Sequence, residues 1–101
     1  MHMPEFQFEW DEAKAASNFR KHGVSFELAS SVFADQLILS VADVEHSEQE
    51  ERWMAIGCAA NSSMLTLVYL WSEAGPVPKK IRLISARRST KTEISYYQEG
   101  I

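Results

Sequence analysis

The chain has 101 residues, 46% of them hydrophobic, which suits one globular domain over residues 1–101 with no room for a second core. Its net charge of -4 argues against a simple nucleic-acid-binding domain, because such domains are usually basic. The single cysteine, Cys58, excludes an internal disulfide and a multi-cysteine zinc site. The longest apolar run, 64–71, is far below the roughly 20 residues that cross a bilayer, so we expect a cytoplasmic protein with no membrane segment and no leader.

The stretch from Phe8 to Phe33 predicts two helices joined by a sharp turn. Asp11 is suited to cap the first helix, and Gly23 to close it in the left-handed conformation. Ser25 is placed to cap the second helix, whose apolar stripe consists of Leu28, Ala29, Val32 and Phe33. Arg20, Lys21 and His22 suit the negative end of the first helix dipole. The turn therefore fixes the cationic pair of Lys21 and His22 at a corner.

Four strands are expected after these helices, over 37–42, 52–59, 64–71 and 79–85. The segment 43–51 reads as an acidic loop. In the last strand, basic and apolar residues alternate in the order Lys80, Ile81, Arg82, Leu83. Because alternate side chains of a strand point to opposite faces, this strand is expected to have one core face and one cationic face.

A final helix is expected to start near Ser89 or Thr90, where Thr90-x-x-Glu93 fits a capping box, and to continue through Ile94 and Tyr97. The order of elements predicts an α+β domain. In it, a single, mostly antiparallel four-stranded sheet is packed against two N-terminal helices and a C-terminal helix.

The charges are segregated along the chain. Six of the ten Lys and Arg residues fall between Lys79 and Lys91 with no acid among them, whereas acids without Lys or Arg gather between Asp43 and Glu51. A local cationic face attracts phosphate even on an acidic protein, since exposed fields decay over a Debye length of about 8 Å in physiological salt. The basic segment is therefore the expected place for an anionic ligand.

Arg82 and Arg87 are the strongest candidates for binding phosphate. The planar guanidinium of arginine donates two parallel hydrogen bonds to phosphate oxygens and stays charged at any working pH. Arg82 is expected on the polar side of its strand, and Arg87 just past that strand, where free N–H groups of the final helix would add to the attraction. The alternative is an ion pair across the sheet for Arg82 and a solvated turn for Arg87.

Three further positions have both a chemical and a structural interpretation. His22, beside Lys21, is either a proton shuttle or a cation that improves the helix dipole. Arg52 either binds phosphate or pairs with the acids beside it, and Tyr97 either contacts a phosphate or base or simply packs its ring. The sequence has no Gly-rich phosphate loop, His-Glu-x-x-His pattern or cysteine and histidine cluster, so we expect no cofactor and no metal.

Four motifs occur in a fixed order: the segment from Phe8 to Phe33, Glu51-Arg52-Trp53, Ile56-Gly57, and Ile81 to Arg87. Together they resemble the BrnT family of toxins from bacterial toxin-antitoxin operons, over about Phe6 to Tyr97. The resemblance implies a RelE-like fold and an endoribonuclease that cleaves RNA without a metal. The candidate catalytic residues are Lys21, His22, Arg52, Arg82, Arg87 and Tyr97.

The resemblance also implies a BrnA-like antitoxin with a ribbon-helix-helix fold, in a complex of two toxins and two antitoxins that contacts operator DNA mostly through the antitoxin. One departure stands out. Where many members read Thr-x-Arg after the aromatic residue of the third strand, this chain reads Leu70, Trp71 and Ser72, so an expected arginine is missing. Lys79 or Lys80 is placed to compensate from the adjacent strand. The alternative is a catalytically weak or inert module that acts as an antitoxin-bound co-repressor.

Overall fold

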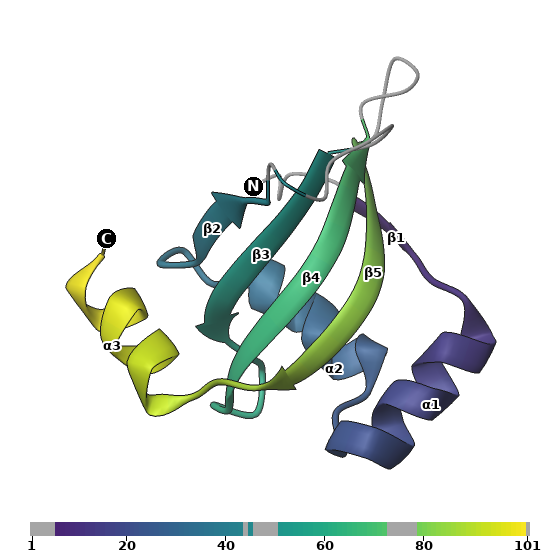
Figure 1. The fold of residues 1–101 in the computed structure, drawn as a ribbon, viewed down its shortest axis with the longest axis horizontal. Coiled ribbons are helices and arrows are strands. Elements are labelled where there is room, and N and C mark those ends of the chain that lie inside the picture. Colours follow the sequence, from purple (N-terminus) through teal and green to yellow (C-terminus); the bar gives the residue numbers. More distant parts are fainter. Residues whose placement is uncertain (1–5, 44, 46–50, 73–78, 101) are drawn as a thin grey trace.

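The computed structural model describes residues 6–43, 45, 51–72 and 79–100, which form one sheet with three α-helices (Figure 1). The helices are α1 (Glu12–His22), α2 (Phe26–Ser30) and α3 (Lys91–Glu99), and the short 3-10 helix η1 (Ser31–Ala34) continues α2. The strands are β1 (Phe6–Glu9), β2 (Leu39–Ala42), β3 (Glu51–Cys58), β4 (Met64–Ser72) and β5 (Lys79–Arg88). Their order in the sheet is β1-β5-β4-β3-β2.

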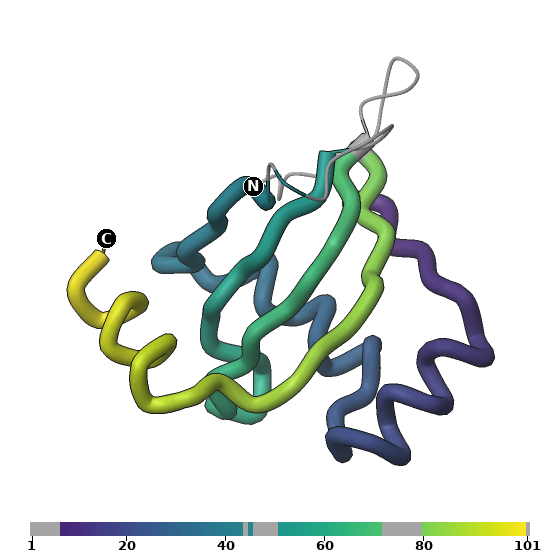
Figure 2. Tube along the Cα trace, in the orientation of Figure 1, coloured from purple at the N-terminus to yellow at the C-terminus, as the bar shows by residue number. Residues whose placement is uncertain are grey.

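The α+β class is confirmed, but the expected four-stranded sheet is wrong in one respect. The sheet has five strands and is mixed, because β1 pairs in parallel with β5, as the trace in Figure 2 shows. The other neighbouring strands are antiparallel, as expected. β1 has only four residues, and it forms by pairing with a strand at the other end of the chain. A local sequence pattern therefore gives little sign of it.

The expected helix caps are present at the N-terminal end of the chain. Asp11 accepts a hydrogen bond from a backbone N–H of the first turn at 3.1 Å, and Ser25 does the same for α2 at 3.0 Å. Gly23 closes α1 with a φ of 70°. The second helix is shorter than expected, because α2 ends at Ser30 and the chain continues as a 3-10 turn. The hydroxyls of Ser30 and Ser31 donate to carbonyls of the preceding turn.

The hydrophobic core lies between one face of the sheet and the N-terminal helices, with α2 behind the strands in Figure 1. Its largest fully buried side chains are Phe26, Val32, Leu65, Leu67, Ile81 and Leu83. Ile81 and Leu83 thus occupy the core face that the alternation in β5 predicts. None of the helices in the described ranges is long and apolar enough to span a bilayer.

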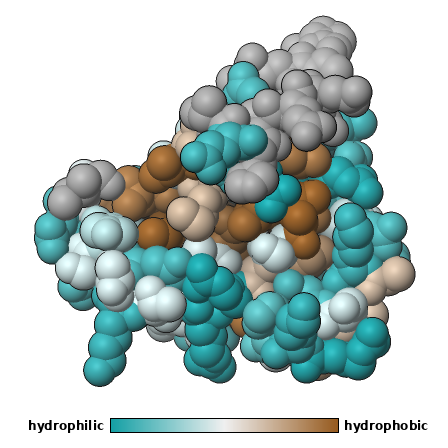
Figure 3. All heavy atoms as spheres, in the orientation of Figure 1, coloured by the Kyte–Doolittle hydropathy of each residue, from teal (hydrophilic) through white to brown (hydrophobic). Residues whose placement is uncertain are grey.

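We call the other side of the sheet the open face. It carries an apolar band that is visible in Figure 3 across the middle of the molecule, bordered by polar side chains. Val41 and Met54 belong to this band and are 49% and 37% exposed. A hollow of about 280 Å³ beside them is lined by Val41, Ala42, Asp43, Trp53, Met54 and Val68. The fold therefore leaves apolar surface in contact with solvent on this side.

Candidate functional site

A bulge in β5 brings Arg87 to the open face, where Lys80 and Arg82 also lie. Residues 68 and 69 of β4 pair with Ser85 and Leu83, which leaves Ile84 as an extra residue in β5. An extra residue reverses the alternation of side chains beyond it. As a result Arg87 faces the same side as Lys80 and Arg82. In an unbroken strand, its odd number of steps from Arg82 would have placed it on the core face.

Arg87 lies within β5, which ends at Arg88, so the expectation that it follows the strand is wrong. The strand is longer than predicted because residues 86–88 still pair with β4, opposite 65–67. This backbone pairing gives Arg87 a fixed starting point on the open face, next to the first turn of α3.

Arg82 and Lys80 share one acidic partner, which comes from β1. In β1, Glu9 lies in register with Arg82, and its carboxylate is 3.4 Å from Arg82 Nη1 and 3.8 Å from Lys80 Nζ. The three side chains are 38% to 49% exposed, so these are surface ion pairs of modest strength. The alternative interpretation of Arg82, an ion pair across the sheet, is therefore present in the structure. Its phosphate-binding role stays a prediction.

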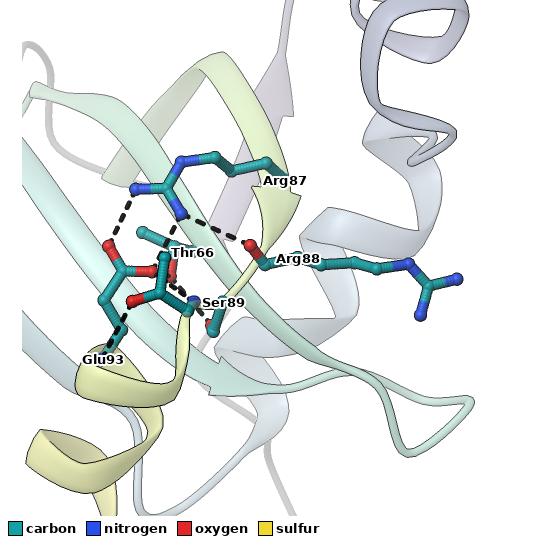
Figure 4. Close-up of polar contacts among 6 residues, drawn as sticks. Thr66, Arg87, Arg88, Ser89 and Glu93 are labelled. Carbon is teal, nitrogen blue, oxygen red and sulfur yellow. Dashed lines mark hydrogen bonds and ion pairs between the residues drawn. The ribbon is translucent and has the colours of Figure 1, made fainter.

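Arg87 is held by a carboxylate of the final helix. Its Nη1 and Nη2 donate to the two oxygens of Glu93 at 2.8 and 2.7 Å (Figure 4). Glu93 Oε1 also accepts from the Thr66 hydroxyl at 2.9 Å and from the Thr90 N–H at 2.8 Å, and Thr66 shares a hydrogen bond of 2.8 Å with the Ser89 hydroxyl. The expected capping box of Thr90 and Glu93 is thus present, and it is part of this polar cluster.

The polar cluster has strong electrostatic consequences. The hydrogen bonds from Arg87, with further ones from Thr90 and Thr66, lower the pKa of Glu93 to about 2 against the opposing effect of burial. The same pair raises the pKa of Arg87 above its ordinary value. Both groups are therefore charged at any pH at which the protein works. Arg87 is 39% exposed and Glu93 only 15%, so solvent reaches the arginine more than the acid.

Tyr97 is bound to an acid rather than free on the helix surface. Its hydroxyl donates to Asp35 Oδ2 at 2.7 Å, and this hydrogen bond is the main reason that the pKa of Tyr97 rises to about 12. Burial would raise the pKa of Asp35, but hydrogen bonds from Cys58 N–H, Tyr97 and Leu37 N–H outweigh it and lower that pKa. The contact fastens α3 to the segment that follows η1.

Arg52 lies near the start of β3, opposite Leu70 of β4. Its Nε is 3.4 Å from Asp43 Oδ2, and the two side chains are 34% and 33% exposed. The sequence interpretation paired Arg52 with the adjacent acids Glu50 and Glu51. The ion pair in the structure is instead with Asp43, and Glu50 lies outside the described residues. Phosphate binding by Arg52 stays a prediction.

Lys21 and His22 end α1 at the corner, and both are exposed. The helix is attached to β5 by Asn18, whose side-chain amide bonds both backbone groups of Ala86, at 2.8 Å to its carbonyl and 3.1 Å from its N–H. The corner and the basic strand are therefore neighbours. Arg87, however, points to the open face. Among the described residues no hydrogen bond joins His22 to Arg87, so a shared pocket stays a prediction.

The structure sorts the six predicted residues into separate small groups. Arg82 is with Glu9, Arg87 with Glu93, Arg52 with Asp43 and Tyr97 with Asp35, while Lys21 and His22 lie at the corner. Asn18, Asp35 and Thr66 were not among the candidates. Two features of the sequence were signals for the polar cluster: Thr66 interrupts an apolar run, and Glu93 completes a capping box. The residues that the structure describes include no group of three or more His, Cys, Asp or Glu side chains suited to a metal.

Comparison with known proteins identifies the family of this chain. The fold is that of a small α+β toxin, and residues 10–93 match the family described as "Ribonuclease toxin, BrnT, of type II toxin-antitoxin system". The chain belongs to this BrnT family. It also resembles the crystal structure of the Brucella abortus ribonuclease toxin BrnT, with a TM-score of 0.52 and 22% identity over 86% of this chain and 100% of that one. No curated protein matches the sequence.

Proposed function

We propose that this chain is the toxin of a type II toxin-antitoxin pair and cleaves RNA in the cytoplasm without a metal ion. The family match over residues 10–93 is the observation that carries the proposal, because the family is one of ribonuclease toxins. The row of Lys80, Arg82 and Arg87 on the open face supports it, since backbone cleavage of RNA concentrates negative charge on the oxygens of the reacting phosphate. Net acidity does not oppose such a role, because the field that matters is local.

In the proposed reaction, a base takes the proton of the 2'-hydroxyl, which attacks the adjacent phosphorus, and an acid protonates the departing 5'-oxygen. Arg87 and Arg82 are assigned to the phosphate, with Arg52 as a further contact. His22, beside Lys21, is assigned to proton transfer, because histidine is the side chain most often used as a general acid or base. Tyr97 has the least support of the six, since its raised pKa and its bond to Asp35 make its proton hard to release.

The direct test is to incubate the purified chain with total RNA, with and without EDTA. We expect cleavage at equal rates in both samples, and a loss on the order of a hundredfold or more in Arg87→Ala, because one charge-assisted contact to a developing anion is worth about 3 kcal/mol. The variant also excludes a contaminating nuclease. Loss of cleavage in EDTA would contradict the metal-free reaction.

A second candidate function follows from position 72. Ser72 pairs with Lys80 in the register of β4 and β5, so the arginine expected from the resemblance would start beside the basic row. Its absence favours a catalytically weak or inert module that acts as an antitoxin-bound co-repressor. The cleavage assay separates the two functions: no cleavage by the natural chain, and cleavage by Ser72→Arg, supports the second one.

We further propose that this chain is inhibited by a BrnA-like ribbon-helix-helix antitoxin. The complex would contain two toxins and two antitoxins, and it would contact operator DNA through the antitoxin. The family match supports an antitoxin partner in general, because the family is one of type II toxin-antitoxin systems. The apolar band on the open face supports a protein partner, because exposed apolar surface rimmed by polar residues is typical of protein interfaces (Figure 3).

A further inference from the structure

The guanidinium of Arg87 has two hydrogen-bonding edges, and only one of them is occupied. Nη1 and Nη2 donate to Glu93, and Nη1 also donates to the Arg88 carbonyl at 3.3 Å. In the described part of the chain, the Nε–H and the second Nη2 hydrogen have no hydrogen-bond acceptor. Figure 4 shows the Glu93 carboxylate on one side of the guanidinium, while the Nε edge lies on the other. That remaining edge is a planar pair of donors, which matches two oxygens of a phosphate.

Glu93 is itself fixed more firmly than a surface acid. Besides the two bonds from Arg87, its Oε1 accepts from the Thr66 hydroxyl and from the N–H of Thr90 at the helix start. Thr66 is 3% exposed, so one end of this support belongs to the sheet. A carboxylate held from β4 and from the first turn of α3 has little freedom to move, and the arginine that bonds to it must adopt its orientation.

We propose that Glu93, supported by Thr66, is a positioning residue that aims the free Nε–Nη2 edge of Arg87 at a phosphate of the RNA substrate. The inference rests on the proposed function, in which Arg87 binds that phosphate. An arginine side chain has much rotamer freedom, and holding it in the reactive geometry beforehand removes that cost from the reaction step. In this role Glu93 touches neither the phosphate nor the attacking hydroxyl.

Two other roles for Glu93 are less consistent with the geometry. As a general base, Glu93 would need a pKa near the working pH, whereas Arg87, burial and the hydrogen bonds from Thr90 and Thr66 together leave it at about 2. As a competitor that blocks Arg87, it would have to cover the edge that faces phosphate, and that edge is the uncovered one.

Steady-state kinetics on a short single-stranded RNA tests the proposal with four variants. Glu93→Gln is expected to lower kcat about 10- to 100-fold with KM nearly unchanged, and to leave both limbs of the pH profile in place. Thr66→Val, which removes one support of Glu93, is expected to give a smaller fall in kcat. Ser95→Ala is the matched control: it removes a hydrogen bond from Ser95 to Glu99 within α3 and none to Arg87 or Glu93, so it should keep kcat.

Arg87→Ala, the fourth variant, separates the failure of this proposal from the failure of the proposed function. If Arg87→Ala cleaves normally, Arg87 does not bind the phosphate and the assigned site is wrong. If Arg87→Ala is inactive while folded Glu93→Gln keeps or exceeds the natural kcat, only the positioning role is overturned. A displaced acid limb in Glu93→Gln would assign Glu93 to proton transfer instead.

A second measurement needs no turnover. A 2'-O-methyl RNA oligonucleotide lacks the attacking hydroxyl, so it binds without being cleaved. The Nε–H signal of Arg87 in nitrogen-edited NMR is expected to be sharp in the natural chain and to shift when this oligonucleotide is added. In Glu93→Gln the same signal should broaden and lose the shift. An unchanged Arg87 signal and an unchanged shift in Glu93→Gln would overturn the proposal, even for a chain without nuclease activity.

Discussion

Arg87 joins the sheet, the final helix and the proposed chemistry in one side chain. It reaches the open face because of the bulge at Ile84, and it binds the carboxylate that also caps α3. Arg87 and Glu93 have each replaced hydrogen bonds to water with hydrogen bonds to the other. Removing one partner therefore leaves the other with unsatisfied hydrogen-bonding groups. The pair therefore affects stability as well as the proposed reaction.

The pair should make stability depend on pH in acid. The folded-state pKa of Glu93, about 2, is below its ordinary value of 4.5. A carboxyl with a lowered pKa stabilises the fold above its ordinary pKa, and the effect is lost as pH falls through the folded value. Between about pH 4.5 and about pH 2, the free energy of unfolding should fall on the order of 2 kcal/mol more in the natural chain than in Glu93→Gln, allowing for the partial exposure of Arg87.

Urea unfolding of the natural chain and of Glu93→Gln at a series of pH values measures this difference. At neutral pH the variant should be the less stable of the two, and the curves should converge in acid. Parallel curves over the whole range would mean that Glu93 has an ordinary pKa in the folded chain, and the account of the cluster would fail.

At the scale of the elements, Gly57 sets how closely η1 approaches the sheet. A Cβ atom at position 57 would lie 2.6 Å from Cγ1 of Val32 and 3.3 Å from Oδ2 of Asp35. Neither side chain has space to retreat, because Val32 is fully buried and Asp35 accepts the N–H of Cys58. The glycine is thus needed for contact between η1 and β3.

Gly57→Ala is expected to destabilise the fold by about 1 to 3 kcal/mol, the usual cost of an overpacked core. Thermal or urea unfolding measures the loss. The double variant with Val32→Ala is the control: it removes the clashing methyl groups, so its loss should be smaller than the sum of the two single losses. Additive losses would show that the contact with Val32 is not the cause.

The elements also show what the sequence makes predictable. The caps at Asp11, Gly23, Ser25 and Thr90 follow from residues within one turn, and all four are present. The strand β1 and the bulge at Ile84 depend on pairing between distant segments, so local patterns miss both. The basic residues of β5, in contrast, lie close together in the sequence and were identifiable as a group. Their acidic partners, which come from other elements, were not.

At the scale of the whole molecule, the helices are distributed unequally over the sheet. One face is covered by α2, with α1 beside β5, whereas the open face keeps its apolar band and carries the polar cluster at one end (Figure 1, Figure 3). Apolar surface in water is costly at about 25 cal/mol per Å², so a partner that covers the band gains affinity from it. The family implies an antitoxin partner, and we propose that this partner covers the band.

Charges introduced into the apolar band should weaken binding to the antitoxin. We expect Met54→Glu to weaken it at least tenfold, because a charge would be buried without a partner. The ligand is the proposed ribbon-helix-helix antitoxin, and calorimetric titration measures the affinity. Ala16→Glu, an exposed position on α1, is the matched control and should bind normally. Equal affinity for folded Met54→Glu would place the interface elsewhere.

In the proposed function, this chain is toxic because its site cleaves RNA through Arg87. The most direct measurement induces the natural chain and Arg87→Ala at equal levels in growing cells, and follows growth together with the integrity of total RNA. We expect growth arrest with RNA fragmentation for the natural chain, and normal growth with intact RNA for the folded variant. Arrest and fragmentation of equal extent in both would contradict it.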